Sequence, residues 1–317
     1  MALPTNTFTT YSAVGNREDL SDAIYRIDPT DTPFMSGIER ERATAVNHEW
    51  ETQALASANS SNAVLEGDDA TTDATTATVR LGNPCQISDK VARVTGTQQS
   101  VQHAGRDDEM AYQEMLKGLE LKRDMETILC GTNQAKNTGA AATARLTGAV
   151  LSWITTNDDL GASGASPTGD GTDTRTDGTQ RVFAESNLKA VLKSCFDNGG
   201  KPTTIMVGSF NKQQFSTFTG RATPMEDTKS KKIVASVDAY ESDFGTLKVV
   251  ANRFQRARDA LVLQMDMWAV AYLPGRRMVS IPLAKTGDSE RRQILSEYTL
   301  VSRNEKASGL VADLTTS

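Results

Sequence analysis

The chain has 317 residues, of which 38 % are hydrophobic and 6 % aromatic, and its formal net charge is −6. No apolar run approaches the roughly 20 residues that a membrane-spanning helix needs. The negative balance argues against a chain-wide basic surface for nucleic acid, and three widely separated cysteines argue against a disulfide framework or a zinc site. The N-terminus shows no secretory signal, so we expect cytosolic synthesis with reduced thiols.

Residues 1–45 are predicted to form an extended arm with one short helix. Leu20, Ala23 and Ile24 have helical spacing. Pro29 and Pro33 then interrupt the helix, because residues before a proline avoid the helical region. Since the segment carries little core of its own, we expect it to lie on another surface.

Residues 46–98 are predicted to form a long hairpin with an exposed tip. Alternating residues over 46–54 indicate a half-exposed strand, with Trp50 on its less polar face. A small, polar stretch follows at 55–73, and further strand patterns occur at 77–81 and 91–95. From Ala43 to Val79 there is no Lys or Arg, so the tip is anionic; its acids are Glu49, Glu51, Glu66, Asp68, Asp69 and Asp73.

The strongest helical pattern covers about residues 100–130. Acidic residues at 107–109 suit the positive end of a helix, and Gly131 is a typical end. A helix of this length would run about 45 Å, which predicts a girder in an extended molecule. Its apolar stripe is predicted to contain Ala111, Met115, Leu119, Met125 and Leu129.

The rest of the chain favours an α+β fold. An apolar island at 146–154 precedes a predicted exposed loop at 161–178. A helix is predicted at 188–196, and a short one at 210–218 with Ser209 as its cap. Helices and strands do not alternate as repeated βαβ units. Strands are predicted at 205–207, 233–237, 247–250, 261–265, 269–273, 278–281, 294–301 and 310–311.

We predict neither a metal nor a cofactor. His48 and His103 have no cysteine or histidine at metal-ligand spacing. The Asp-rich stretch 170–178 invites a calcium interpretation, but with Asp173 as position one of an EF-hand loop, Arg175 falls on position three and no Glu closes the loop. No Walker A loop or dinucleotide-binding fingerprint is present.

Three short patterns occur in the order found in serine penicillin-recognising enzymes. Ser186 and Lys189 match S-x-x-K, Ser209 and Asn211 loosely match S-x-N, and residues 285–287 match K-T-G. Ser186 would be the nucleophile, activated by the lysine one turn later. The segment between the first two patterns holds only a helix and a strand, which leaves no room for the helical subdomain of such enzymes. A serine acyl hydrolase is therefore kept only as an alternative.

Basic residues concentrate in the last third of the chain, far in sequence from the anionic hairpin. They form either ordinary solvated surface, which would include Lys231-Lys232, Arg253, Arg256 and Arg258, or an electrostatic contact surface. If the charges meet between subunits, the candidate contacts are Glu66, Asp68, Asp69 and Asp73 in the hairpin and Arg276, Arg277, Arg291 and Arg292 near the C-terminus.

The order of arm, polar hairpin, long helix and α+β domain resembles that of tailed-phage major capsid proteins of the Hong Kong 97-type fold. The stretches 15–20 and 28–34 resemble the N-terminus of one branch, the phage major head proteins, and 283–288, 297–300 and 304–309 resemble its C-terminus. The resemblance is weakest at 131–180, which looks like an insertion. It also accounts for Lys285-Thr286-Gly287 without an enzyme.

This resemblance implies a division of the chain. Residues 1–45 would be the N-terminal arm and 46–98 the extended E-loop hairpin, both reaching onto neighbouring subunits. Residues 99–140 and 270–303 would form the peripheral domain with its spine helix, and 141–269 and 304–317 the axial domain.

The implied function is assembly into hexamers and pentamers of an icosahedral head around double-stranded DNA, without catalysis. The implied partners are other copies of the chain, portal and scaffold proteins and cement proteins, with no membrane. The chain would be made in the host cytoplasm and end in the virion capsid. A tail tube or decoration protein is the first alternative, although it would not need the girder helix.

Overall fold

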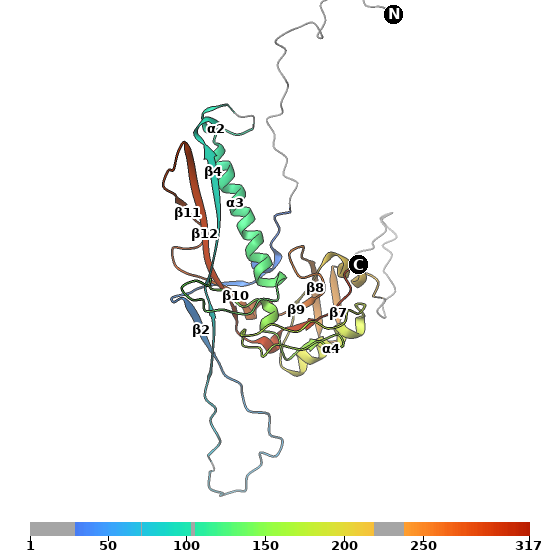
Figure 1. Ribbon diagram of the computed structural model, residues 1–317. Helices are drawn as coiled ribbons and strands as arrows, with labels where there is room; N and C mark the ends of the chain where they lie inside the picture. The colour runs from blue at the N-terminus through green and yellow to red at the C-terminus, as the bar shows by residue number, and fades with distance from the viewer. Residues whose placement is uncertain (1–28, 71, 103–104, 219–237) are drawn as a thin grey trace, which may run out of the picture.

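A computed structural model describes residues 29–70, 72–102, 105–218 and 238–317. The chain is elongated: a long helix and a sheet extend from one end of the body, and a hairpin loop projects from the other (Figure 1). The predicted helix over residues 20–24, His103, Lys231-Lys232 and the predicted strand at 233–237 lie outside the described residues.

A five-stranded sheet is built on one 14-residue strand, β12 (Ser289–Ser302). β12 pairs antiparallel with β4 (Gln86–Thr95) on one side and with β10 (Trp268–Tyr272) and β11 (Val279–Pro282) on the other. β1 (Glu39–Arg42) pairs parallel with β10. The sequence analysis placed 46–98 in one hairpin; in the structure the last strand of that range, β4, is part of this sheet instead.

The long helix is shorter than predicted. α3 (Glu109–Glu126) packs along β4 and continues as a π-helical turn, η1 (Thr127–Gly131), so only the predicted end at Gly131 is correct. The carboxylate of Asp108 accepts a hydrogen bond from the Ala111 N–H at 3.1 Å and starts the helix there. Residues 96–100 form a separate short helix, α2 (Gly96–Ser100). Met115, expected in the apolar stripe, is 45 % exposed.

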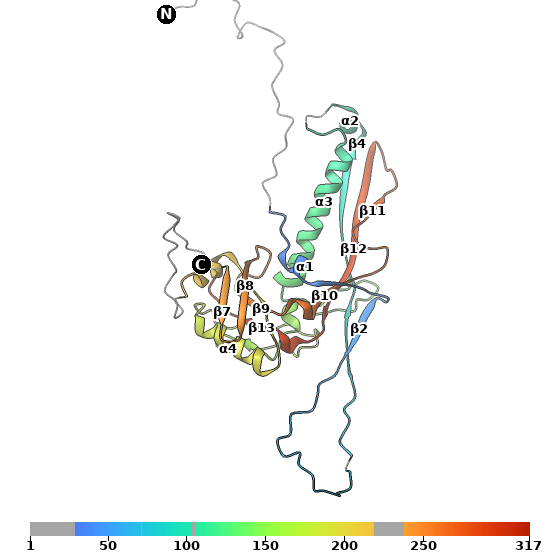
Figure 2. The ribbon, with the colours of Figure 1, turned by 180° about the vertical axis from the view of Figure 1, so that it is seen from behind.

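A six-stranded sheet forms the other half of the body, in the order β5-β13-β9-β6-β8-β7. The helix α4 (Glu185–Asp197) covers it, and α5 (Ser209–Phe215) follows β6 (Figure 2). The predicted apolar stripe of α4 is confirmed for Leu188, Val191, Leu192 and Cys195, but Phe196, also expected in it, is 58 % exposed. Gly208 and not Ser209 precedes α5 as its cap. The strands are β5 (Asp158–Asp159), β6 (Thr204–Val207), β7 (Ala239–Ser242), β8 (Gly245–Ala251), β9 (Ala260–Leu263) and β13 (Gly309–Val311).

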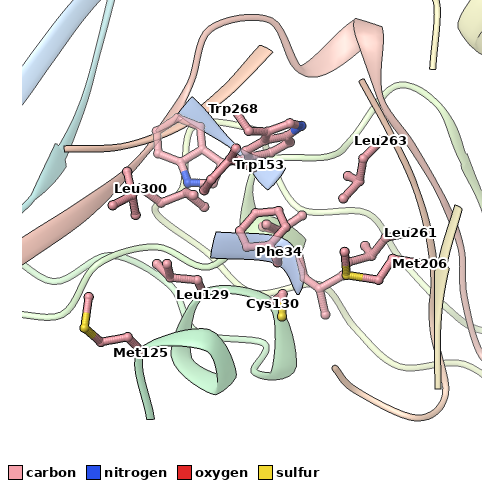
Figure 3. Close-up of a cluster of buried hydrophobic side chains, with 14 of the residues drawn as sticks. Phe34, Met125, Leu129, Cys130, Trp153, Met206, Leu261, Leu263, Trp268 and Leu300 are labelled. Atoms are coloured by element: carbon pink, nitrogen blue, oxygen red, sulfur yellow. The ribbon is translucent and has the colours of Figure 1, made fainter. Parts of the chain in front are cut away.

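One buried cluster joins the two sheets (Figure 3). It combines the apolar island predicted at 146–154 with the end of the long helix and with strands of both sheets. Trp153 and Trp268 are its largest members, and both are fully buried. Because side chains from every part of the body meet here, the two sheets share a core.

The segment just after the N-terminal stretch is also part of this core. Phe34, in α1 (Pro33–Gly37), is fully buried, and the next residues form β1 at the edge of the five-stranded sheet. The expectation that residues 1–45 have little core and lie on another surface is therefore wrong for 33–43. A single buried aromatic side chain in a polar context gave too weak a periodic signal to be recognised.

A buried carboxylate holds α1 in place. Glu126 accepts hydrogen bonds from the backbone N–H groups of Phe34 and Met35 at 2.8 and 2.9 Å, and from the Asn252 amide at 2.8 Å. Burial raises the pKa of Glu126, while the three hydrogen bonds act in the opposite direction. The carboxylate therefore ties the arm, the long helix and the chain after β8 together.

The loop at 161–178, predicted to be exposed, is fixed by a buried arginine. The Arg175 guanidinium donates to Asp259 at 3.1 Å and to Asp313 at 3.3 Å, and all three side chains are buried. Arg256 and Arg258, which the sequence analysis counted as surface charge, pair with Asp177, and Arg258 also pairs with Asp313. An ion network thus replaces the apolar core that the loop lacks.

Within the described ranges, no helix is both long and apolar enough to cross a membrane. The same residues contain no group of three or more His, Cys, Asp or Glu side chains that could hold a metal ion.

We expect Leu192→Ala to destabilise the subunit by about 2–5 kcal/mol, because the side chain is buried between α4 and the six-stranded sheet. Urea denaturation of the purified chain measures this. Lys189→Ala on the exposed side of the same helix removes only a pair with Glu185 and should cost about 0–1 kcal/mol. Equal effects of the two changes would contradict the burial of Leu192.

We expect Glu126→Ala to cost about 2–4 kcal/mol, because it leaves the N–H groups of Phe34 and Met35 without an acceptor and leaves the Asn252 amide with only the weak sulfur acceptors of Cys130 and Met206. Glu120→Ala in the same helix removes a partly exposed pair with Lys117 and serves as the control. Thermal and urea melting of both variants test the difference. If Glu126→Ala melts like the wild type, the carboxylate does not hold the arm.

Candidate assembly surfaces

The two arms of the hairpin rest on the body. β2 (Asn47–Thr52) and β3 (Val79–Pro84) pair antiparallel, and the predicted alternation of β2 is confirmed: even-numbered residues are half-buried. The Trp50 ring packs on Trp153 with the ring centroids 5.4 Å apart, and His48 lies 3.6 Å from a Glu41 carboxylate oxygen. His48 therefore has a structural environment, as expected.

The loop between these arms stands free of the body. Every described residue from 53 to 78 is exposed, and in both views the loop points away from the long helix (Figures 1 and 2). We call residues 53–78 the hairpin tip. It contains the candidate acids Glu66, Asp68, Asp69 and Asp73, none of which forms an ion pair among the residues that the structure describes.

The hairpin tip also carries exposed apolar side chains that the sequence analysis did not single out. Leu55 is 97 % exposed, Val64 83 % and Leu65 78 %. Val64 and Leu65 directly precede the acids at 66, 68 and 69. Val64 and Leu65 are thus adjacent exposed apolar side chains bordered by carboxylates, and contiguous exposed apolar side chains are a feature of interaction surfaces.

The four candidate arginines lie on the five-stranded sheet or beside it. Two of them, Arg291 and Arg292, are adjacent in sequence but point to opposite faces of the sheet. Arg292 points to the long helix, where it contacts Glu114 at 3.1 Å and Glu290 at 3.3 Å. Arg291 points to the other face, where it donates to the Ala284 carbonyl at 2.8 Å and forms no ion pair with the residues that the structure describes. Alternation along a strand separates them.

Arg276 and Arg277 are also engaged within the subunit. Arg276 contacts the buried carboxylate of Glu297 at 2.5 Å, and Arg145 contacts the same carboxylate at 2.8 Å. The guanidinium carbon of Arg277 lies 4.9 Å from the ring centroid of Tyr272. The structure thus brings none of the four arginines to the hairpin tip of the same chain.

The residues of the catalytic and calcium alternatives do not form sites. Ser186 and Ser209 are exposed on the six-stranded half, whereas Lys285 lies in the turn between β11 and β12, beside α2. Asp173 accepts hydrogen bonds from Thr168, and Asp170 from Thr168 and Thr172. Protein donors therefore occupy the carboxylates of the Asp-rich stretch.

Comparison with known proteins matches nearly the whole chain. A family model described as the SU10 major capsid protein covers residues 3–315. The major capsid protein of Escherichia phage Phieco32 is 27 % identical over 348 residues, which cover 98 % of this chain and 97 % of that protein.

Solved phage capsids share the fold. The capsid of a native GTA particle has a TM-score of 0.63 at 12 % identity, over 96 % of this chain and 98 % of that one. The capsid of cyanophage A-1(L) has a TM-score of 0.62 at 13 % identity, over 97 % and 98 % of the two chains. The α+β, Hong Kong 97-type fold predicted from the sequence is thereby confirmed, and the chain belongs to the SU10 major capsid protein family, a family of structural proteins of the phage head.

Proposed function

We propose that this chain assembles into the hexamers and pentamers of an icosahedral head that encloses double-stranded DNA. The observation that carries the proposal is the hairpin tip, which leaves the body with every described residue exposed. An isolated loop with three exposed apolar side chains gains stability only by contact with another surface. Obligate assemblies bury large interfaces, often above about 2,000 Å², and projecting loops supply such area without a larger core.

Four parts of the chain would have separate roles in this head. Residues 46–98 would contain the E-loop hairpin, whose paired arms are β2 and β3, together with β4, which belongs to the five-stranded sheet. The arm would be 1–45, of which 33–43 are tied to their own subunit. The peripheral domain (99–140 and 270–303) contains α3, β11 and β12. The axial domain (141–269 and 304–317) contains all six strands of the second sheet.

Portal, scaffold and cement proteins are the other proposed partners, and assembly takes place in the host cytoplasm. A net charge of −6 disfavours tight, non-specific binding of the packaged DNA, which depends on Lys and Arg neutralising phosphates. We propose no catalytic activity, because the described positions of Ser186 and Lys285 lie in different halves of the molecule.

The hairpin tip of one subunit is proposed to dock on a basic surface of its neighbour. The candidate contacts are the four acids of the tip and Arg276, Arg277, Arg291 and Arg292. Charge pairs of this kind contribute about 0–1 kcal/mol each, and their complementarity mainly fixes the geometry of the partners. Because a shell repeats each contact many times, small free energies per contact add up over the whole assembly.

Electron microscopy of the chain, expressed alone or with a scaffold protein from its phage, tests the proposed function. We expect closed shells, or sheets and tubes of regular capsomers. A nitrocefin hydrolysis assay with Ser186→Ala as control tests the enzyme alternative, and we expect no difference between the two proteins. A monomer that never assembles, or turnover that depends on Ser186, would contradict the proposal.

Reversing Asp68 and Asp69 to Lys should impair assembly without changing subunit melting, because both carboxylates are exposed and neither forms an ion pair among the described residues. Light scattering during assembly and electron microscopy measure the loss. High salt should weaken the wild-type contact, since charges are screened over about 10 Å at 0.1 M. Normal shells from the double variant would refute the role of these acids.

A further inference from the structure

The hairpin leaves the body beside the ring of Trp153. The Trp50 ring of β2 packs on this ring with the centroids 5.4 Å apart, and the ammonium nitrogen of Lys136 lies 5.5 Å from its centroid. The same ammonium donates a hydrogen bond to the Gly82 carbonyl of β3 at 2.9 Å. Both strands of the hairpin are therefore held by groups that meet at Trp153. We call Trp50, Gly82, Lys136 and Trp153 the hairpin seat.

Three contacts tie the chain around the end of β3 to residues 131–150. Two of them involve buried side chains: the Gln86 side-chain oxygen accepts from the Gln134 amide at 3.0 Å, and the Asn83 side-chain oxygen accepts from the Gly148 N–H at 2.8 Å. The third contact, made by Lys136, is the nearest in sequence to the exposed loop. Every described residue from 53 to 80 is exposed. The contact of Lys136 is therefore placed where the hairpin takes its direction.

Lys136 also binds the loop at 161–178. Its ammonium donates to the Asp170 carbonyl at 2.6 Å, and its backbone N–H donates to the Gly171 carbonyl at 2.7 Å. The buried guanidinium of Arg175 ties this loop to carboxylates at the ends of two strands of the six-stranded sheet. One ammonium group thus connects β3 of the hairpin with a loop that is anchored in the other half of the body.

Packing of the Trp50 ring does not by itself fix an angle. The indole nitrogen of Trp50 is buried and has no hydrogen-bond partner among the described residues, so apolar contact holds the ring. Apolar contact is non-directional, whereas a hydrogen bond has a preferred length and angle. Two hydrogen bonds from Lys136 to carbonyls of separate segments fix how these segments lie relative to each other.

We infer that Lys136 is the positioning residue that sets the direction of the hairpin relative to the body, and that the loop at 161–178 acts through it as a brace. The inference rests on the proposed function, in which the hairpin has to meet a neighbouring subunit. Both Lys136 and the loop lie within 131–180, the part of the chain where the sequence resembles capsid proteins least. The brace is therefore a feature of this chain and does not follow from the resemblance.

The length of the hairpin makes its direction important for assembly. The loop projects far from the body (Figures 1 and 2), and each limb of the hairpin tip has about 13 residues and extends up to roughly 43 Å. A change of about 10° at the hairpin seat moves the end of such a limb by roughly 7 Å. That displacement exceeds the ~3.4 Å that one residue spans in a strand. A hairpin without a fixed direction would therefore meet its neighbour at varying positions.

The distance between two spin labels in the full-length, unassembled chain tests the inference. Leu55→Cys in the hairpin and Val182→Cys on the six-stranded half carry the labels, because both positions are exposed, and the native cysteines are buried. Lys136→Met keeps an apolar stem beside Trp153 but removes the donors of both hydrogen bonds. We expect it to at least double the width of the distance distribution. Lys136→Arg keeps the charge and the donors and should leave the distribution within about a quarter of the wild-type width.

Lys122→Met is the matched control, because Lys122 is exposed on α3 and its replacement removes the same charge. It should leave both the label distance and assembly unchanged. Electron microscopy of assembled samples should show at most a third of the wild-type yield of regular closed shells for Lys136→Met. Thermal melting shows first that each subunit is folded. If Lys136→Met does not fold, Lys136→Gln, which keeps an amide donor on a shorter side chain, is measured in its place with the same expected widening.

Each outcome decides the inference. A widened distribution and few regular shells for Lys136→Met, with Lys136→Arg and Lys122→Met like the wild type, support it. An unchanged distribution for Lys136→Met, equal widening for Lys122→Met or Lys136→Arg, or a normal yield of shells from Lys136→Met overturns it while the proposed function stands. A wild-type chain that forms no ordered assembly contradicts the proposed function, whereas the labelled, unassembled subunits still show whether Lys136 sets the direction of the hairpin.

Discussion

The buried carboxylate of Glu126 sets the geometry on which the rest of the subunit depends. A carboxylate without water needs donors, and here three come from two distant segments, α1 and the chain after β8. Satisfying them fixes the end of the long helix against the six-stranded sheet and holds Phe34 in the shared core. Because α1 leads directly into β1, the same contact determines where the five-stranded sheet gains its edge strand.

Ionic pairing also separates the arginines into two groups. Arg175, Arg256 and Arg258 hold the loop at 161–178 to the end of the chain, and Arg276 and Arg292 pair within the five-stranded half. For most of these residues the sequence analysis considered two environments, a solvated surface or a contact surface. The structure shows a third environment, an ion pair inside the subunit, for all five arginines named above. Arg93 and Arg291, which lie opposite each other on β4 and β12, form hydrogen bonds but no ion pair among the described residues.

Local patterns were sufficient wherever a segment follows one period. Four of the five residues predicted for the apolar stripe of α4, the alternation of β2 and the strands from β8 to β13 could be predicted, because each depends on spacing within a few residues. The errors arose where contacts with residues distant in the sequence determine whether a side chain is buried. Arg175 is held by carboxylates 84 and 138 positions away in the sequence, and no local sequence pattern predicts these contacts. Phe34 is buried by residues that follow it by about a hundred positions.

For the candidate contact surface, too, sequence reasoning found only the residues that a local pattern marks. The acids of the hairpin could be found from composition alone, since no basic residue interrupts residues 43–79. Selecting among the arginines required the structure, because the predicted strand began at 294 and left Arg291 and Arg292 outside it, whereas β12 begins at Ser289 and places them on opposite faces. Arg93 was overlooked because it lies in a strand pattern with no basic neighbour, and only pairing brings it opposite Arg291.

An elongated subunit with strong internal pairing and weak outer charges suits an assembly that must correct its errors. The core, the Glu126 junction and the ion network keep each subunit in one shape before it meets a neighbour, which lowers the ordering cost of binding. The surfaces left for partners carry short apolar rows and exposed charges, and single contacts of that kind are weak and reversible. A misplaced subunit, held by few contacts, can therefore dissociate. A correctly placed subunit forms several contacts and is retained, because the first contact raises the effective concentration of the groups that form the others.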